Sequence, residues 1–443
     1  MRRILLLGAG KSSGYLIRFL LDKSVSENLF ITVAGLDVNE MLAKTQHHPR
    51  TAIEILDVNH KESVSLLVQQ CDLVISLLPP HLHLLAAECC LLHQKHFLTA
   101  SYVSADLKKL HEQAIKNQLI FLNEIGLDPG IDHMSALRLL NRLKKQGAKI
   151  LGFKSYCGGL IAPESDTNAW HYKFTWNPRN VVLAGQGLPA QFLQDGQIKY
   201  VPYAQLFKRT ETFSLQSGNF EGYINRDSLA YQKLYGLNKV KTFIRGTLRY
   251  QGFCSAWDIL VQLGLTDHLL VIEDSEHLTA FDFINRFLIG NATENLIEKI
   301  EKTLDKKLSA DQIQKINELE FTENTQALGI PQATAAVMLE KILLKHWALA
   351  PNDKDLVVMC HEITYQLNQE IKTVQSELQV MGEDQTYTAM AKTVGLPLGI
   401  AALLILNKKI KNYGVLLPLD TSIYEPVLSE LEKYQIRFME KEC

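Results

Sequence analysis

The sequence lacks both a pattern of paired cysteines and an excess of charge of either sign. Its seven cysteines follow no paired spacing, which argues against a disulfide framework and against a cysteine-based zinc site. The formal net charge of −2 provides no basic excess for nucleic acid and no charged tail for a membrane surface. We therefore expect reduced thiols in a cytoplasmic protein, with no nucleic-acid partner and no membrane partner.

Long hydrophobic runs and metal-binding histidine patterns are also lacking. The longest apolar run, residues 399–406, is too short to span a bilayer. The first ten residues, MRRILLLGAG, contain only a brief apolar stretch and no small-residue cleavage pattern, so we expect no signal peptide. We expect no metal site, because the histidines in the first hundred residues that we considered as ligands have no ligand-like spacing. They are His47, His48, His81, His83, His93 and His96.

The first fourteen residues predict a dinucleotide-binding site. Residues 4–7 form a short apolar strand, residues 8–14 a glycine-rich turn, and a helical pattern follows. Gly8 allows the tight turn, Gly10 lets the backbone approach a pyrophosphate, and the helix N-terminus favours the anion. Ser13 occupies the third fingerprint position, where glycine or alanine is usual. The cofactor-binding residues expected here are Gly8, Gly10, Lys11, Ser12 and Ser13.

An acidic residue follows the second expected strand, Leu29–Gly35. There Asp37 can accept hydrogen bonds from the adenosine ribose, and its charge repels a 2′-phosphate. No arginine stands beside it. The sequence therefore favours NAD as the cofactor, with NADP also possible. In the alternative interpretation, Asp37 only caps the next helix, at residues 39–44.

Strands and helices alternate up to residue 123 and predict a Rossmann-type doubly wound α/β domain. Further strands are expected at residues 51–56, 72–78, 97–100 and 119–123. Ligands bind at the carboxyl ends of parallel strands, so we expect the site there. The candidate residues at these ends are Asp57, Val58, Leu77, Ala100, Ser101 and Tyr102. Residues 126–133 (GLDPGIDH) follow the last strand and are therefore also candidates for the site. Alternatively, they are only a crossover loop in which Asp132 caps a helix.

The second half of the chain predicts an α+β substrate domain with a helical insertion. We expect strands at residues 149–157, 172–176 and 241–250, helical segments at 280–306 and 326–347, and a hairpin at 354–381. The expected domains are 1–123 with 388–443 (dinucleotide-binding), 124–280 with 351–387 (substrate-binding and dimerisation), and 281–350 (helical insertion). An edge of the hairpin could pair with a second copy, so we expect a homodimer.

Several longer stretches resemble the saccharopine dehydrogenases of the L-glutamate-forming type, along nearly the whole chain. These stretches are residues 126–133, 155–160, 162–164, 172–176, 225–228, 247–252, 388–399 and 414–418. Two loops, at 165–169 and 178–187, do not follow the family pattern. The fungal members are similar to NADP enzymes with a basic residue near the second strand, where this chain has Leu36 and Asp37.

The resemblance implies a reaction in lysine metabolism. Saccharopine is oxidised at its lysine-side carbon, hydride passes to the nicotinamide, and water hydrolyses the imine to L-glutamate and 2-aminoadipate 6-semialdehyde, or the reverse occurs. Such a substrate carries three carboxylates and an ammonium, so bidentate cations are expected. Arg226 and Arg249 lie in family-matching stretches, and Arg245 is a weaker candidate.

The remaining expectations for the site combine the resemblance with this chemistry. Asp128, Tyr102 and Cys157 are expected at the reacting centre as candidates for moving protons, although Cys157 is alternatively an inert core thiol. His133 is more typical of a hydrogen-bonding residue at a helix start. The other expected substrate-binding residues are Ser101, Leu127 and Thr247, and the other cofactor-binding residues are Gly126, Asp128 and Trp176.

Two other functions fit part of the pattern. A related reductase would condense another aldehyde with an amino acid or a polyamine, but it would need fewer arginines than this chain offers. A catalytically silent NAD-binding sensor would need only the dinucleotide-binding half. The stretches that resemble the family around the expected substrate pocket therefore argue against a sensor.

Overall fold

The computed structural model describes residues 1–224, 227–291 and 293–442, which form two compact units. The first unit contains Met1–Lys149, Gln366–Ile371 and Leu378–Lys441. The second contains Ile150–Tyr365 and Lys372–Glu377, together with Glu442. Residues 124–149, which we expected in the substrate domain, cluster with the first unit. The three-domain division remains a prediction.

The first unit is built on a seven-stranded parallel sheet, as expected for a Rossmann-type fold. Its strand order is β15-β6-β5-β4-β1-β2-β3, and every neighbouring pair is parallel. The strands are β1 (Arg2–Leu7), β2 (Leu29–Gly35), β3 (Thr51–Ile55), β4 (Leu73–Ser76), β5 (His96–Thr99), β6 (Ile120–Leu122) and β15 (Gly414–Leu416). The central strand β4 is buried along its whole length, as expected for a strand covered on both faces.

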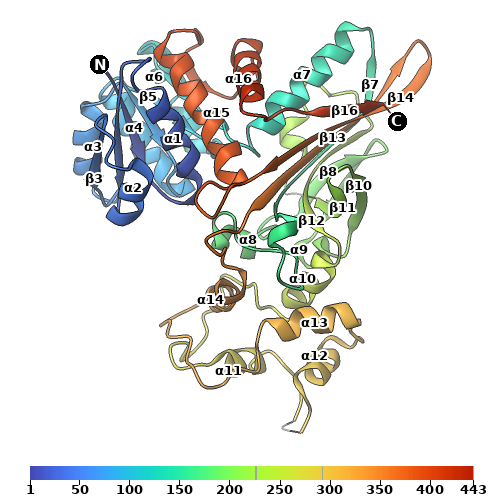
Figure 1. Ribbon diagram of the computed structural model, residues 1–443. Coiled ribbons are helices and arrows are strands. Elements are labelled where there is room, and N and C mark those ends of the chain that lie inside the picture. Colours follow the sequence, from blue (N-terminus) through green and yellow to red (C-terminus); the bar gives the residue numbers. More distant parts are fainter. Residues whose placement is uncertain (225–226, 292, 443) are drawn as a thin grey trace. The chain divides into compact units, whose positions relative to one another are not determined.

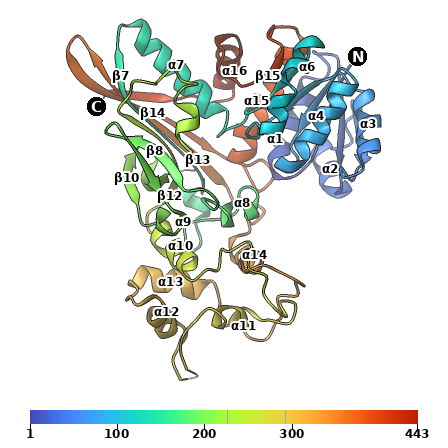
Figure 2. The same ribbon diagram turned by 180° about the vertical axis from the view of Figure 1, so that it is seen from behind.

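Helices cover both faces of this sheet. On one face α1 (Gly14–Asp22) packs against α15 (Ala389–Leu406), and on the other α3 (Lys61–Gln69) packs against α4 (His83–Leu92) (Figures 1 and 2). The remaining helices of this unit are α2 (Val38–Thr45), α5 (Ala105–Lys109), α6 (His111–Lys116), α7 (Ile131–Lys145) and α16 (Thr421–Lys433).

Helix α15 is long and apolar enough to cross a membrane by length and composition alone. The apolar run noted in the sequence, residues 399–406, is the second half of this helix. In the protein 78% of its 18-residue window is buried. The helix packs closely on α1, because a side chain at Gly395 would meet the backbone of Leu16 at 2.8 Å. It is therefore a core helix of the first unit.

A second, mixed sheet has the order β10-β11-β12-β7-β13-β14-β16, with the pair β8–β9 beside β12, and most of its strands lie in the second unit. Strands β7 and β12 are parallel, whereas β11 is antiparallel to both β10 and β12. The strands are β7 (Lys149–Ile161), β8 (Ala190–Gln194), β9 (Gln197–Val201), β10 (Thr210–Leu215), β11 (Gly218–Ile224), β12 (Thr242–Tyr250), β13 (Asp355–Leu367), β14 (Glu370–Met381) and β16 (Met439–Glu442). The expected hairpin is confirmed as β13 and β14.

Two expectations for the second unit were wrong. Residues 172–176 form no strand; they are an irregular buried segment in which the Phe174 N–H donates to the Trp347 carbonyl at 2.7 Å. The pattern of alternating aromatic residues therefore reflects burial in a core rather than a pleated sheet. The strands β8 to β11 were also missed, because their outward-facing positions are mostly polar and exposed.

The helical insertion is broken into short helices. Its helices are α11 (Ala280–Asn285), α12 (Leu296–Leu304), α13 (Ala310–Glu318) and α14 (Ala335–Trp347), which appear in yellow to orange in Figure 1. Outside the insertion, the second unit also contains α8 (Pro178–Val182), α9 (Tyr203–Leu206) and α10 (Phe253–Gln262). Capping boxes start α12 at Asn295 and α13 at Ser309. Such caps satisfy the N–H groups of a new helix, so the segment at 280–306 does not form the long helix that we expected.

The second sheet is tightly packed around the Tyr156 side chain. The Tyr156 side chain is 1% exposed, and its ring lies 4.4 Å from that of Phe213 between centroids. A Cβ at Gly222 would lie 2.9 Å from this ring, and one at Gly246 would meet both the ring and the Tyr223 carbonyl, the latter at 2.6 Å. The two glycines therefore leave the space in which the tyrosine is buried.

We predict that Gly246→Ala lowers the free energy of unfolding by about 2 kcal/mol, because the added methyl overpacks this region. The matched control is Gly152→Ala in β7, where a Cβ would make only ordinary contacts at 3.6 Å; we expect it to change stability by less than about 0.5 kcal/mol. Urea denaturation of both variants measures the difference. Equal effects of the two substitutions would contradict this account of the packing.

Candidate functional site

The turn that follows β1 has the space that a pyrophosphate needs. Gly8 has a φ of +94°, and its N–H donates to the Ala34 carbonyl at 2.9 Å. A Cβ built on Gly10 would find no heavy atom within 4 Å. The turn continues through Lys11–Ser13 into α1. This open space, next to a helix N-terminus, fits the phosphates of a dinucleotide.

A buried lysine holds the carbonyl groups of this turn. The Lys44 ammonium donates to the Ala9 carbonyl at 2.5 Å, the Gly10 carbonyl at 2.9 Å and the Ser13 hydroxyl at 3.1 Å. It also pairs with Glu40 at 2.7 Å. Burial lowers the pKa of Lys44, against the opposing effect of Glu40. We did not predict this residue, because a lysine near the end of an amphipathic helix normally lies in solvent.

The packing role of the third fingerprint glycine is taken by Gly14 rather than by Ser13. A Cβ at Gly14 would lie 2.7 Å from the Thr386 carbonyl. The segment that contains Thr386 is held to α1 by Glu383, which pairs with Arg18 at 2.9 Å and accepts a hydrogen bond from the Tyr15 hydroxyl at 2.6 Å. The hydrogen bond from Arg18 is the main cause that lowers the pKa of Glu383 to about 2. The departure from the fingerprint therefore follows from a close approach one residue later.

The acidic residues after β2 and β3 cap local structure. The Asp37 Oδ1 accepts a hydrogen bond from the Glu40 N–H at 2.9 Å and caps α2, as the alternative interpretation expected. Within the described residues no hydrogen bond is found for its Oδ2, so a ribose could still bind there. Asp57 accepts two hydrogen bonds from Asn59, which lower the pKa of Asp57. Val58 packs on the core of the first unit.

Several predicted site residues lie together after β5 and β6. The Tyr102 hydroxyl donates to Asp128 Oδ1 at 3.0 Å. A Cβ at Gly126 would lie 2.8 Å from that of Ala100, and Leu127 is buried. The peptide bond Asp128–Pro129 is cis. A phenol and a carboxylate that share a hydrogen bond can pass a proton between them. Leu77, which follows β4, is half-buried, and its N–H donates to the Leu7 carbonyl at 2.8 Å.

Three buried titratable groups connect the loops on either side of Asp128. His133 Nε2 lies 3.0 Å from Glu124, and its Nδ1 lies 3.3 Å from Asp132. Glu124 accepts a hydrogen bond from the Val103 N–H at 3.0 Å, and Asp132 accepts one from the Gly130 N–H at 2.6 Å. His133 lies at the start of α7, as we expected. The three groups connect the backbone beside Tyr102 to the loop that contains Asp128.

A second network holds the hydroxyl of Ser101. His83 Nδ1 lies 2.8 Å from the Ser76 hydroxyl, and its Nε2 lies 2.7 Å from the Ser101 hydroxyl. Burial lowers the pKa of His83 to about 4, so the imidazole is neutral at pH 7. We had considered this histidine only as a metal ligand. Its position, seven residues after the end of a strand, gave no signal for a role at Ser101.

In the second unit, Arg249 is a buried cation. Its side chain is only 4% exposed, and its Nη1 donates to the Leu248 carbonyl at 3.0 Å. Among the described residues its Nε has no hydrogen-bond partner and its guanidinium has no carboxylate in ion-pair distance. Rings surround it instead: its Cζ lies 5.2, 5.9 and 5.3 Å from the ring centroids of Tyr172, Tyr223 and Phe253.

The Arg249 guanidinium stays charged despite this burial. Burial alone would lower the pKa of Arg249, but the nearby phenol and thiol groups raise it above its ordinary value. An isolated buried charge is costly unless an anion accompanies it. A ligand carboxylate that accepts hydrogen bonds from the guanidinium would supply that anion. This expected role for Arg249 therefore has a physical basis.

The other residues predicted in this unit lie on or near the same strands. In the register of β7 and β12, Cys157 is paired with Thr247, and Tyr223 of β11 lies on the other side of Thr247. Arg245 is buried with its guanidinium 4.4 Å from the ring centroid of Tyr231. Trp176 is half-buried and packs on the core of this unit. Arg226 lies outside the described residues.

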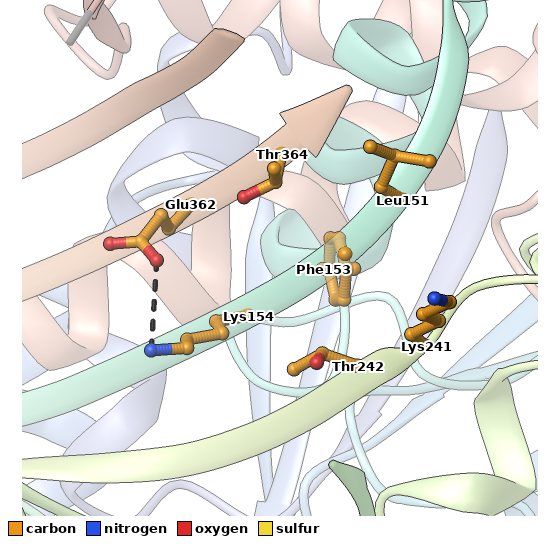
Figure 3. A pocket seen from close by; sticks show the side chains of 8 residues that line it. Leu151, Phe153, Lys154, Lys241, Thr242, Glu362 and Thr364 are labelled. Atoms are coloured by element: carbon orange, nitrogen blue, oxygen red, sulfur yellow. Dashed lines mark ion pairs between the residues drawn. The ribbon is translucent and has the colours of Figure 1, made fainter. Parts of the chain in front are cut away.

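A hollow elsewhere on the second sheet contains none of the predicted site residues. It has a volume of about 270 Å³ and lies over β7, β12 and β13. Lys154 crosses it toward Glu362 at 3.6 Å (Figure 3), and the same ammonium pairs with Glu211 at 2.5 Å. Two lysines line the hollow, Lys154 and Lys241, and the ammonium of Lys154 is already paired with two carboxylates.

Comparison with known proteins identifies two matching domains. The saccharopine dehydrogenase NADP binding domain matches residues 4–122, and the saccharopine dehydrogenase C-terminal domain matches residues 126–436. A saccharopine dehydrogenase [NADP(+), L-glutamate-forming] from Schizosaccharomyces pombe is 32% identical over 100% of this chain and 99% of its own. The apo saccharopine dehydrogenase (L-Glu forming) structure from Saccharomyces cerevisiae superposes with a TM-score of 0.87, at 30% identity, over 100% of both chains.

Longer proteins also match. The alpha-aminoadipic semialdehyde synthase of Arabidopsis thaliana is 34% identical over 96% of this chain but only 42% of its own length. The mitochondrial enzyme of the same name from Rattus norvegicus is 33% identical over 99% of this chain and 47% of its own. The chain thus spans less than half of these relatives. Together with the turn at Gly10, the comparisons support a nicotinamide dinucleotide cofactor, and the names of the matching domain and relatives favour NADP over NAD.

We predict that Arg249→Met leaves the free energy of unfolding of the ligand-free protein unchanged or raises it by about 1 kcal/mol, because it removes a buried charge to which the described residues bring no carboxylate within ion-pair distance. The control is Arg18→Met. Arg18 is paired with Glu383 and lies 4.2 and 4.1 Å from the ring centroids of Tyr15 and Tyr387, so we expect a loss of about 1 kcal/mol. Chemical denaturation without ligand measures both. A large loss of stability in Arg249→Met would show that this arginine supports the fold.

Proposed function

The chain belongs to the saccharopine dehydrogenase family, and on that premise we propose that it is an NAD(P)-dependent enzyme that oxidises saccharopine. Saccharopine, the oxidised dinucleotide and water give L-glutamate, 2-aminoadipate 6-semialdehyde, the reduced dinucleotide and a proton, and the reaction also runs in reverse. The observation that carries the proposal is the buried guanidinium of Arg249, which lacks a carboxylate partner among the described residues. A substrate with three carboxylates can provide one.

The proposed reaction has two proton-transfer stages. When bound, the nicotinamide accepts a hydride from the lysine-side carbon. The substrate nitrogen loses its proton and a C=N bond forms; water then adds to that carbon, and the C–N bond breaks to release glutamate. Tyr102 and Asp128, joined by a hydrogen bond of 3.0 Å, are the groups that we assign to take and return these protons.

The other predicted residues are assigned to binding and orientation. Ser101 and Thr247 carry hydroxyl groups that can donate to a carboxylate, and Leu127 provides an apolar contact. Cys157 is assigned to the reacting centre because its strand position adjoins that of Thr247. Arg226, which lies in a stretch that resembles the family, is assigned to a second carboxylate. Correct placement of the amine against the nicotinamide provides most of the rate enhancement.

For the cofactor, we propose that this chain prefers NAD, although the names of its relatives favour NADP. The support is local. Asp37 is exposed directly after β2, and its negative charge opposes the 2′-phosphate of NADP. Neither neighbour, Leu36 or Val38, is basic. The helix cap formed by Asp37 uses only one of its two oxygens among the described residues, so capping and ribose binding are compatible.

The homodimer expected from the hairpin β13–β14 and the cytoplasmic location also stay proposals. Of the alternative functions, a reductase acting on a polyamine needs fewer cationic groups, and a sensor needs no substrate site. The buried Arg249 argues against both alternatives, because a cation that costs stability is retained only where an anion binds.

We predict that the purified protein reduces the nicotinamide cofactor when saccharopine is added and that Arg249→Met lowers kcat/KM for saccharopine at least 100-fold, about 3 kcal/mol, by removing a charge-assisted contact. Initial rates at 340 nm measure both. Arg179→Met is a matched control, because Arg179 is half-exposed and pairs with Glu340 at 3.1 Å. A folded wild-type protein without turnover would contradict the proposal and favour the sensor or another amine substrate.

A separate prediction tests the preference for NAD. Asp37→Ser removes the charge but keeps an oxygen that can cap α2. We expect wild-type kcat/KM to be at least about tenfold higher with NAD than with NADP, and the variant to reduce or reverse this ratio by removing roughly 1.4 kcal/mol of discrimination. Initial rates with each cofactor provide the ratio. A wild-type preference for NADP would keep the proposed reaction and overturn the assignment of NAD.

A further inference from the structure

A buried histidine joins the ends of two neighbouring strands to the Ser101 hydroxyl. Ser76, the last residue of β4, lies 2.8 Å from His83 Nδ1, and the Ser101 hydroxyl lies 2.7 Å from Nε2. Both strands end at the edge of the sheet where doubly wound folds bind ligands. Ser76 and His83 are 0% and 2% exposed, whereas Ser101 is half-buried. The network therefore runs from the interior of the first unit to a hydroxyl that a ligand can reach.

The orientation of the His83 ring is determined by several contacts. Thr99 Oγ1 lies 3.3 Å from Nε2 and also accepts a hydrogen bond from the Ser101 N–H at 3.2 Å. The ring lies against Phe97, with centroids 6.4 Å apart at an interplanar angle of 70°. A neutral imidazole has one donor and one acceptor nitrogen, and here each nitrogen lies beside a hydroxyl. The ring therefore fixes the direction of the Ser101 hydroxyl whichever nitrogen holds the proton.

We propose that His83 is a positioning residue, which acts on the bound substrate or cofactor only by holding the Ser101 hydroxyl. This inference rests on the proposed function, because it takes Ser101 as a ligand-binding residue. A hydroxyl that is already oriented loses less conformational freedom when a ligand binds. Removing the imidazole would let the Ser101 side chain turn among its rotamers.

Space filling alone does not account for this histidine. An apolar side chain would fill the same volume without the cost of burying two polar nitrogens. His96 provides a comparison in the same sheet, because its Nδ1 accepts a hydrogen bond from the Ile120 N–H at 3.1 Å and thus satisfies backbone only. His83 instead connects two side-chain hydroxyls, and one of them is a predicted ligand contact.

Two amide substitutions distinguish the hydrogen bond at Nδ1 of His83 from the one at Nε2. The amide of glutamine can reach the position of Nε2, so His83→Gln retains a partner for Ser101. The shorter asparagine reaches only the position of Nδ1, so His83→Asn retains the partner of Ser76 and releases Ser101. We expect His83→Asn to lower kcat/KM about tenfold, as Ser101→Ala does, and His83→Gln to remain within about threefold of wild type. His93→Asn is the control, because His93 pairs with Ser65 at 2.7 Å away from the strand ends.

The double variant tests whether His83 acts through Ser101. If it does, His83→Asn causes no further loss when Ser101 is already alanine, so the two effects are not additive. The loss should occur in KM for the ligand that Ser101 contacts, with thermal unfolding unchanged. Additive losses, or equal losses in His83→Asn and His83→Gln, would overturn the inference in favour of a structural role.

The same variants distinguish failure of this inference from failure of the proposed function. If the wild-type protein does not turn over saccharopine, the proposed function fails. The two His83 variants, Ser101→Ala and the double variant are then compared by their dissociation constants for the reduced nicotinamide cofactor and for saccharopine. Non-additive losses in either constant would still support the inference. If Ser101→Ala changes neither constant, Ser101 holds no ligand and the inference is overturned.

Discussion

The chemistry assigned to the second unit depends on one unbalanced charge, the guanidinium of Arg249. Aromatic rings of Tyr172, Tyr223 and Phe253 surround it, and they offset part of the cost of its burial through their π faces. They cannot accept the hydrogen bond that the Arg249 Nε–H lacks among the described residues. Protein interiors rarely retain such a group without a compensating partner. A ligand carboxylate would provide that partner, and the substrate that we propose, saccharopine, carries three.

In the first unit, buried side chains hold backbone and hydroxyl groups in position. Lys44 holds two carbonyls of the glycine turn, and His83 holds the Ser101 hydroxyl. Glu124 and His133 connect the loops that contain Tyr102 and Asp128. In each case a buried polar side chain orients a group that we propose to contact the ligand. These supporting hydrogen bonds from buried side chains are needed because loops at strand ends have no regular backbone hydrogen bonding of their own.

Patterns that repeat along the chain could be predicted from the sequence, and single long-range contacts could not. The parallel sheet, the glycine turn and the hairpin β13–β14 follow from apolar runs and turn residues. The segment at 172–176 was mistaken for a strand, because alternating aromatics also suit an irregular core segment. Lys44 was missed because the turn groups that it contacts lie far away in the sequence. His83 was missed because no local pattern marked it as a partner of Ser101. Arg249 was identified by family resemblance, whereas its burial without an anion became visible only in the structure.

The most direct test of the central claim measures which carboxylate of the ligand Arg249 binds. Saccharopine and its three singly amidated forms are titrated into the wild-type protein and into Arg249→Met by calorimetry. The account predicts that one amide weakens binding to the wild type at least tenfold, about 1.4 kcal/mol, and weakens binding to the variant no further. If all three amides lose the same affinity in both proteins, the buried guanidinium does not bind the substrate, and the assignment of Arg249 is wrong.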